Sequence, residues 1–242
     1  MSRKRKPKIE KDTRHEHKVD NLSSQPKPEI QEKKYEIILT AMNDEQKQLI
    51  KEINKNLITF VTGKPGTGKT FISTILGLIG LLENKYKKLI LTRPCVEAFG
   101  ESLGFLPGNY NEKIGPYMIP IFDAISEYIP QKDLEKLVLD KRIITLPLAY
   151  HRGCTFSNSF VIADEFENTI PSQMRLFLTR TGKNSKVVVT GDLAQTDIEG
   201  MNGLQDAIKR LKGVEGIGMI EMSAKAIVRN PIIEKIEEEY NK

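Results

Sequence analysis

The residues with the clearest chemistry lie in one short segment, residues 63–70, which reads Gly-Lys-Pro-Gly-Thr-Gly-Lys-Thr. It matches the pattern G-x-x-x-x-G-K-[ST], whose glycines let the backbone curl so that successive N–H groups point at phosphate oxygens. A helix that begins at the end of such a loop adds the partial positive charge of its N-terminus. The segment therefore predicts a site for a nucleoside triphosphate.

Two side chains of this loop have expected roles, and its backbone is expected to surround the phosphates. Lys69 should reach the β- and γ-phosphates, and the Thr70 hydroxyl should ligate Mg²⁺. Because a strand at 57–62 and a helix at 69–83 flank the loop, a chance match in a Gly-rich turn is disfavoured. We expect ATP and Mg²⁺ as the bound groups. The backbone cradle comprises Gly63, Lys64, Pro65, Gly66, Thr67, Gly68, Lys69 and Thr70.

A second polar group follows an apolar run at residues 159–165, Ser-Phe-Val-Ile-Ala-Asp-Glu. At the carboxyl end of a buried strand, Asp164 is expected to hold Mg²⁺ through its water shell. Glu165 is expected to orient and polarise the attacking water, a role typical of hydrolases. The alternative is a charge pair that simply faces solvent.

The third group lies in residues 186–197, a buried run followed by Gly-Asp-Leu-Ala-Gln-Thr-Asp. Thr190 and Gln195 should lie at the carboxyl edge of the sheet, where open α/β sheets bind ligands. The Gln195 amide can hydrogen-bond both the γ-phosphate and the attacking water. In the alternative, this is an ordinary loop in which Asp192 and Asp197 bind backbone amides.

Gln46 has two interpretations that the sequence leaves open. A carboxamide can pair its donor and acceptor with the edge of an adenine base. However, Asn43 followed three residues later by Gln46 also forms a capping box at a helix start.

Short β-rich runs alternate with helical segments from about residue 35 onward. This alternation favours right-handed βαβ units, and hence a mostly parallel sheet with helices on both faces. The fold class is therefore α/β, with a single domain over residues 35–242. Strands are expected at 57–62, 88–92, 142–146, 160–164, 186–190 and 218–222, and helices near 43–54, 69–83, 116–129, 132–139, 171–181, 203–212 and 231–240.

Residues 1–34 differ from the rest in composition. They hold 11 Lys and Arg against 6 Asp and Glu, so they account for all of the net charge of +5. With few large apolar side chains, this stretch is predicted to be a disordered basic tail. Such a tail either binds nucleic acid through phosphate neutralisation or serves as a solubilising linker.

Other features exclude several classes of protein. No apolar run reaches the roughly 20 residues of a membrane span, and the basic start lacks the apolar stretch of a secretory signal. The two cysteines, Cys95 and Cys154, fit neither a disulfide framework nor a metal site. We therefore expect a cytoplasmic protein without membrane partners, in the host cytoplasm if a bacteriophage encodes it.

Taken together, these motifs resemble the PhoH-like family of P-loop ATPases, which is related to the first RecA-like domain of superfamily one helicases. The resemblance begins near Asn43 and continues to the carboxyl terminus. It implies a compact bacterial or bacteriophage member with a RecA-like sheet, in which the 186–190 strand lies between the P-loop strand and the Asp164 strand. Besides the P-loop, the segments that carry it are 91–108, 112–113, 116–117, 121–124, 147–153, 173–182 and 228–231.

The sequence departs from the family pattern at three places. Lys64-Pro65 stands where Pro-Ala is usual, which should change only exposed side chains. Glu167 stands where the family usually has Gln, beside the expected active site. An acidic residue is also usual in the segment before Arg229, which here reads Ala-Ile-Val.

The resemblance further implies ATP hydrolysis coupled to single-stranded RNA or DNA, as in a helicase-like motor. Arg229 resembles the helicase arginine that completes the catalytic site, with Arg180 and Arg152 as alternatives. Since this chain has no second RecA-like domain, a neighbouring subunit is expected to complete the site, in a ring and most plausibly a hexamer. The usual nuclease domain of longer members is also missing from this sequence.

Nucleic-acid contacts and competing functions stay open at this level. Charged and stacking groups for a nucleic acid are offered by Arg93, Phe105, Tyr110, Tyr117 and the pair His151-Arg152, although the aromatic rings could equally pack internally. One competing function is a nucleotide-gated scaffold with slow hydrolysis. Another is a small-molecule kinase, which the Asp164-Glu165 pair disfavours.

Overall fold

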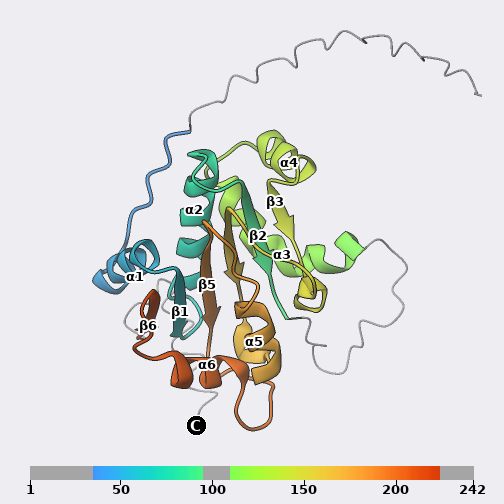
Figure 1. Ribbon diagram of the computed structural model, residues 1–242. Helices are drawn as coiled ribbons and strands as arrows, with labels where there is room; N and C mark the ends of the chain where they lie inside the picture. Colours follow the sequence, from blue (N-terminus) through green and yellow to red (C-terminus); the bar gives the residue numbers. More distant parts are fainter. Residues whose placement is uncertain (1–34, 95–109, 224–242) are drawn as a thin grey trace, which may run out of the picture. The chain divides into compact units, whose positions relative to one another are not determined.

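The computed structural model describes residues 35–94 and 110–223, with side chains from Met118 onward in the second range. Within them a six-stranded, wholly parallel sheet has the order β3-β2-β4-β5-β1-β6 (Figure 1). The predicted position of β5 between the P-loop strand and the Asp164 strand is confirmed. The strands are β1 (Ile58–Gly63), β2 (Lys88–Thr92), β3 (Ile143–Thr145), β4 (Ser159–Ala163), β5 (Lys186–Gly191) and β6 (Ile217–Met222).

Helices cover both faces of this sheet, as the alternating pattern predicted. Strand β4 is buried on both faces of the sheet. Phe160 and Ile162 belong to one apolar cluster, and Val161 and Ala163 belong to the other. A strand buried on both faces reads as a continuous apolar run. The first cluster includes side chains of α1 (Asp44–Lys55), α2 (Lys69–Leu82), α3 (Tyr110–Ser126) and α4 (Gln131–Leu139), and the second those of α5 (Pro171–Leu178) and α6 (Gly203–Leu211).

The described residues therefore form a single α/β domain, as expected, and the bounds of α3 and α5 differ from the predicted ones. Helix α3 runs from Tyr110 to Ser126 and not over 116–129, although Gly115 and Pro116 inside it are poor helix formers. Helix α5 ends at Leu178, since Thr181 pairs with Phe156 in an isolated bridge. The predicted tail at 1–34 and the predicted helix at 231–240 lie outside the described residues.

A buried lysine fixes α1 against the sheet. Lys186 starts β5, and its Nζ donates hydrogen bonds to the carbonyls of Ile53, Asn54 (3.0 Å) and Asn56 (2.5 Å) at the end of α1. Its ammonium thus satisfies carbonyls that a helix end leaves without partners. Because α1 carries Gln46 at its other end, this contact also fixes one wall of the nucleotide-binding loop.

No helix within 35–94 or 110–223 has the length and apolar character needed to cross a membrane.

Candidate nucleotide-binding site

The loop between β1 and α2 needs glycine at specific positions. Gly66 and Gly68 have φ angles of 83° and 90°, in the left-handed region that other residues rarely adopt. A Cβ atom on Gly68 would also lie 2.9 Å from Nε2 of Gln46. The glycines of the motif are therefore required by backbone conformation and by close packing.

The Lys69 and Thr67 side chains both donate hydrogen bonds to backbone carbonyls of the loop. Lys69 is the first residue of α2, and its Nζ donates to the carbonyls of Gly63 (2.5 Å) and Lys64 (2.9 Å). The Thr67 hydroxyl donates to the same Lys64 carbonyl at 3.0 Å. A phosphate oxygen carries more negative charge than these carbonyls, so Lys69 can exchange them for a nucleotide.

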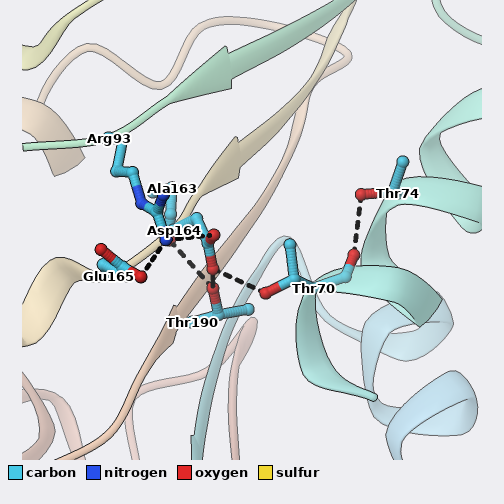
Figure 2. A network of polar contacts seen from close by, with 7 residues as sticks. All are labelled: Thr70, Thr74, Arg93, Ala163, Asp164, Glu165 and Thr190. Carbon is cyan, nitrogen blue, oxygen red and sulfur yellow. Dashed lines mark hydrogen bonds and ion pairs between the residues drawn. The ribbon is translucent and has the colours of Figure 1, made fainter. Parts of the chain in front are cut away.

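Asp164 is fixed from two sides by hydroxyl groups. Its Oδ1 accepts hydrogen bonds from Thr70 Oγ1 (2.7 Å) and Thr190 Oγ1 (2.5 Å), as Figure 2 shows. Because Thr70 directs its proton to Asp164, its lone pairs are available to a cation. The pair offers the hard oxygen ligands that Mg²⁺ prefers, and water and phosphate oxygens would complete the shell. The residues present thus fit a Mg²⁺ ion.

Glu165 follows at once, with a φ of 56°, a left-handed conformation that is uncommon for a non-glycine residue. Its Oε1 forms an ion pair with Nη2 of Arg93, which follows β2. The same Nη2 lies 3.6 Å from Oδ2 of Asp164. Figure 2 shows Glu165 and Thr70 on opposite sides of Asp164.

These side chains line one pocket of about 310 Å³. Glu167 lines it, and the family pattern had placed this residue beside the active site, whereas Arg93 joins the pocket without having been predicted as a nucleotide-site residue. The sequence suggests Arg93 only as a nucleic-acid contact. The one feature that could have placed it at the nucleotide site is its position directly after a predicted strand. The lining residues are Pro65, Gly66, Gly68, Lys69, Thr70, Phe71, Arg93, Pro120, Asp164, Glu165, Glu167, Gly191, Asp192 and Gln195. A larger, mainly apolar hollow between α5 and α6 contains none of the predicted site residues.

Glu167 is one of four carboxyl groups that line this pocket, and it is only 4% exposed. Burial raises its pKa to about 7, and the negative charges of Asp164 and Asp192 act in the same direction. Its Oε2 has no hydrogen-bond partner among the described residues. The neutral, protonated side chain, which the usual Gln would mimic, is therefore populated up to a higher pH than for an exposed Glu.

Gln46 forms part of the predicted capping box, whereas its contact with an adenine base stays a prediction. Its backbone N–H donates to Asn43 Oδ1 at 2.9 Å, which is half of a capping box, but its Oε1 accepts from Met42 instead of Asn43. Its Nε2 donates to the Thr67 carbonyl at 3.1 Å. The side chain therefore braces the nucleotide-binding loop directly.

The loop after β5 brings Gln195 to the pocket, where it is exposed. Asp192 forms the turn before it, with its Oδ1 accepting from the Ala194 N–H at 3.0 Å. Asp192 thus binds a backbone amide, as the alternative interpretation held for that residue. Asp197 contributes its own N–H, which donates to Asn168 Oδ1 at 2.9 Å.

Several predicted residues do not meet at this pocket. Arg229 lies outside the described residues, as do Phe105 and the side chains of Tyr110 and Tyr117. Arg152 and Arg180 do not line the pocket. His151 is fully buried against aromatic rings, so it offers no surface to a nucleic acid.

Comparison with known proteins identifies relatives over most of the chain. Residues 38–241 match the family model described as PhoH-like protein. The PhoH-like protein of Synechocystis sp. is 44% identical over 207 residues, covering 85% of this chain and 63% of that protein. The PhoH-like protein of Bacillus subtilis is 44% identical over 199 residues, covering 81% and 62%. Protein PhoH of Escherichia coli is 34% identical over 207 residues, covering 84% and 58%.

This chain thus spans less than two thirds of the length of these relatives.

Two solved structures are similar at low identity. The Sulfolobus solfataricus SWI2/SNF2 ATPase core in complex with dsDNA has a TM-score of 0.47 at 14% identity, covering 81% of this chain and 47% of that one. The Pif1 helicase from Candida albicans has a TM-score of 0.40 at 17% identity, covering 84% and 44%.

Proposed function

Because this chain belongs to the PhoH-like family of P-loop ATPases, we propose that it binds ATP with Mg²⁺ and hydrolyses it in a cycle coupled to single-stranded RNA or DNA. The observation that carries the hydrolysis proposal is the placement of Asp164 and Glu165 beside Lys69 and Thr70 in one pocket. A nucleotide-binding loop alone serves many functions. A second carboxylate next to the cation site is what a hydrolase requires.

The side chains divide the reaction among them. Lys69 stabilises negative charge on the γ-phosphate, while Glu165 orients the attacking water and accepts its proton. Gln195, which lies in the loop after β5, hydrogen-bonds both the γ-phosphate and the attacking water. Mg²⁺, when bound at Thr70 and Asp164, supplies neutralisation of the phosphate charge.

Coupling to a nucleic acid is supported by the charge distribution. Residues 1–34 carry all of the net positive charge, while the rest of the chain is neutral overall. A basic segment binds the phosphate backbone without regard to base sequence, and its affinity falls with salt. The charge distribution thus supports a nucleic acid as the partner, and the family resemblance narrows the proposed substrate to single-stranded RNA or DNA.

Phosphate release tests this function. Wild-type protein, Lys69→Ala and Glu165→Gln are each measured with ATP alone, with single-stranded RNA and with single-stranded DNA. We expect turnover that one nucleic acid raises, and a loss of about 10²–10⁴-fold in Glu165→Gln while ATP still binds. Lys51→Ala, a change at an exposed lysine of α1, is the matched control for Lys69→Ala.

Glu167 favours one second candidate, a nucleotide-gated scaffold with slow hydrolysis. The Glu167 carboxyl group, where the family usually has a neutral Gln, adds negative charge to the pocket once it ionises, which opposes turnover. Tight ATP binding with negligible phosphate release under every condition would support the scaffold and contradict the motor.

The ring assembly is proposed with Arg229 of one copy acting at the neighbour's nucleotide. Mixing two inactive variants tests this. Lys69→Ala keeps Arg229, and Arg229→Ala keeps the nucleotide site, so a mixed ring should regain part of the activity if the arginine acts between subunits. No recovery in the mixture, or a monomeric mass with ATP at full turnover, would contradict it.

A further inference from the structure

Arg93 is a pocket residue without an assigned role in the hydrolysis. It lies directly after β2, while the nucleotide-binding loop follows β1, and β4 and β5 lie between these two strands in the sheet. Its guanidinium contacts both acidic residues of the site, through the ion pair with Glu165 and the 3.6 Å approach to Asp164. The Arg93 side chain is 19% exposed, so this contact is partly shielded from water.

The two acids are held very differently. Asp164 accepts hydrogen bonds from Thr70 and Thr190, and its side chain is 11% exposed. The Glu165 side chain is 48% exposed, and its only described polar contact is Arg93. Its backbone is also in the left-handed region, which stores strain in a non-glycine residue. Arg93 therefore determines where the Glu165 carboxylate lies.

This arrangement conflicts with the role of a general base. The Glu165 oxygen that accepts from the guanidinium cannot at the same time accept from an attacking water in the same direction. The ion pair holds one of the two carboxylate oxygens and offsets the carboxylate charge, so both oxygens of Glu165 are available to a water only when Arg93 moves to a different anion. A phosphate group is the natural competitor, because its oxygens match the guanidinium fork and carry more charge.

We propose that Arg93 is a positioning residue that restrains Glu165 until a phosphate group draws the guanidinium away. The inference rests on the proposed hydrolytic function and adds its regulation. Two sources can supply the phosphate: the backbone of a bound nucleic acid, or the γ-phosphate of ATP itself. Both release Glu165 by the same exchange of partners, and no bond is made or broken in that step.

Steady-state ATP turnover of Arg93→Gln and Arg93→Lys, with and without single-stranded oligonucleotide, tests the proposal. If nucleic-acid phosphate is the trigger, Arg93→Gln raises the basal kcat several-fold, leaves KM for ATP unchanged and brings the stimulation ratio toward one. If the γ-phosphate is the trigger, Arg93→Gln raises KM several-fold without lowering kcat and leaves the stimulation intact. Arg93→Lys keeps the charge and should lie between wild type and Arg93→Gln.

Other results overturn it. A lower kcat at unchanged KM would make Arg93 a group that stabilises the transition state, and kinetics equal to wild type would make the ion pair irrelevant. Arg142→Gln is the matched control, since Arg142 binds the Leu81 carbonyl and Asn84 away from the pocket. Urea unfolding of each variant separates a folding defect from a kinetic one.

The proposed function and this inference fail differently. Wild-type turnover that Lys69→Ala abolishes, with Arg93→Gln unchanged, overturns only the role of Arg93. If the wild type is silent, the restraint predicts that Arg93→Gln switches turnover on. Silence of both proteins overturns both proposals.

Discussion

Thr190 donates a hydrogen bond of 2.5 Å to Oδ1 of Asp164, joining the carboxyl ends of two adjacent strands. Thr190 is fully buried, so water does not compete for this contact. A hydroxyl from the adjacent strand, together with the Thr70 hydroxyl of the nucleotide-binding motif, therefore sets the orientation of the carboxylate.

Replacing Thr190 with Val tests that orientation. The side chain keeps its shape but loses the donor, and a hydrogen bond to a charged group contributes about 1.5–3 kcal/mol. We expect kcat/KM for ATP to fall roughly 10–100-fold, with a higher Mg²⁺ concentration needed for half-maximal activity. Thr190→Ser, which keeps the hydroxyl, should retain most activity. An unchanged Mg²⁺ requirement in Thr190→Val would contradict the assignment.

Gln46→Ala separates bracing of the loop from capping of the helix. The variant loses the hydrogen bond to the Thr67 carbonyl, so we expect KM for ATP to rise about tenfold with little change in kcat, a loss of roughly 1–1.5 kcal/mol. Asn43→Ala removes only the cap of α1 and should lower stability by about 1 kcal/mol while leaving KM near wild type. If Gln46 also reads adenine, Gln46→Ala should lose its preference for ATP over GTP. Equal effects of both variants on KM would contradict this separation.

Glu167→Gln should change the pH dependence of stability. The unfolded chain releases the Glu167 proton near pH 4.5, whereas the folded chain keeps it until about pH 7. Stability of the wild type therefore falls as the pH rises through this interval, by up to about 3 kcal/mol, and levels off above it. The neutral amide of Glu167→Gln should be more stable at pH 8 and no different at pH 4.

Urea unfolding at several pH values measures that difference. Glu199→Gln, at an exposed position of the loop after β5, is the matched control and should follow the wild type. A constant gap between wild type and Glu167→Gln from pH 4 to pH 8 would show that Glu167 ionises in the folded protein as it does in water.

Gly191→Ala should disturb the same acid sterically. A Cβ atom at Gly191 would lie 2.5 Å from Oε2 of Glu167 and 2.6 Å from Cδ2 of Leu204. Both neighbours are buried, so we expect a loss of about 1–3 kcal/mol of stability, measured by urea unfolding. Adding Glu167→Ala should restore part of it, because one of the two clashes is then removed. No rescue in the double variant would indicate that Leu204 alone accounts for the loss.

The sequence predicts most of the fold because its signals are local or periodic. Strand β4 is a continuous apolar run that ends in acids, and helix α2 follows a loop of fixed pattern, so both could be placed from their own residues. The position of β5 between β1 and β4 came only from the family resemblance. Helix α3 begins earlier than predicted, at Tyr110, because Gly115 and Pro116 weaken the helix signal of a stretch that is nevertheless helical.

The candidate site was harder to predict where it depends on contacts across the sheet. The relation between Thr70 and Asp164 follows from the motif, but Arg93 comes from a strand whose sequence gives no sign of its partner. The ion pair with Glu165 exists because β2 and β4 are neighbours. Similarly, nothing in the residues around Glu167 shows that β5 would bury it, so its raised pKa is a product of the tertiary structure.

Edge strand β6 has a mechanical consequence for the site. Its last residue, Met222, lies beside Gly63 at the start of the nucleotide-binding loop. The next residue, Ser223, donates through its N–H to Glu45 in the first turn of α1 at 2.7 Å. A force applied to the chain at Ser223 would therefore act on the loop and on the helix that carries Gln46 at once. Strand β6 is therefore mechanically connected to the nucleotide-binding loop through Gly63 and to α1 through Glu45.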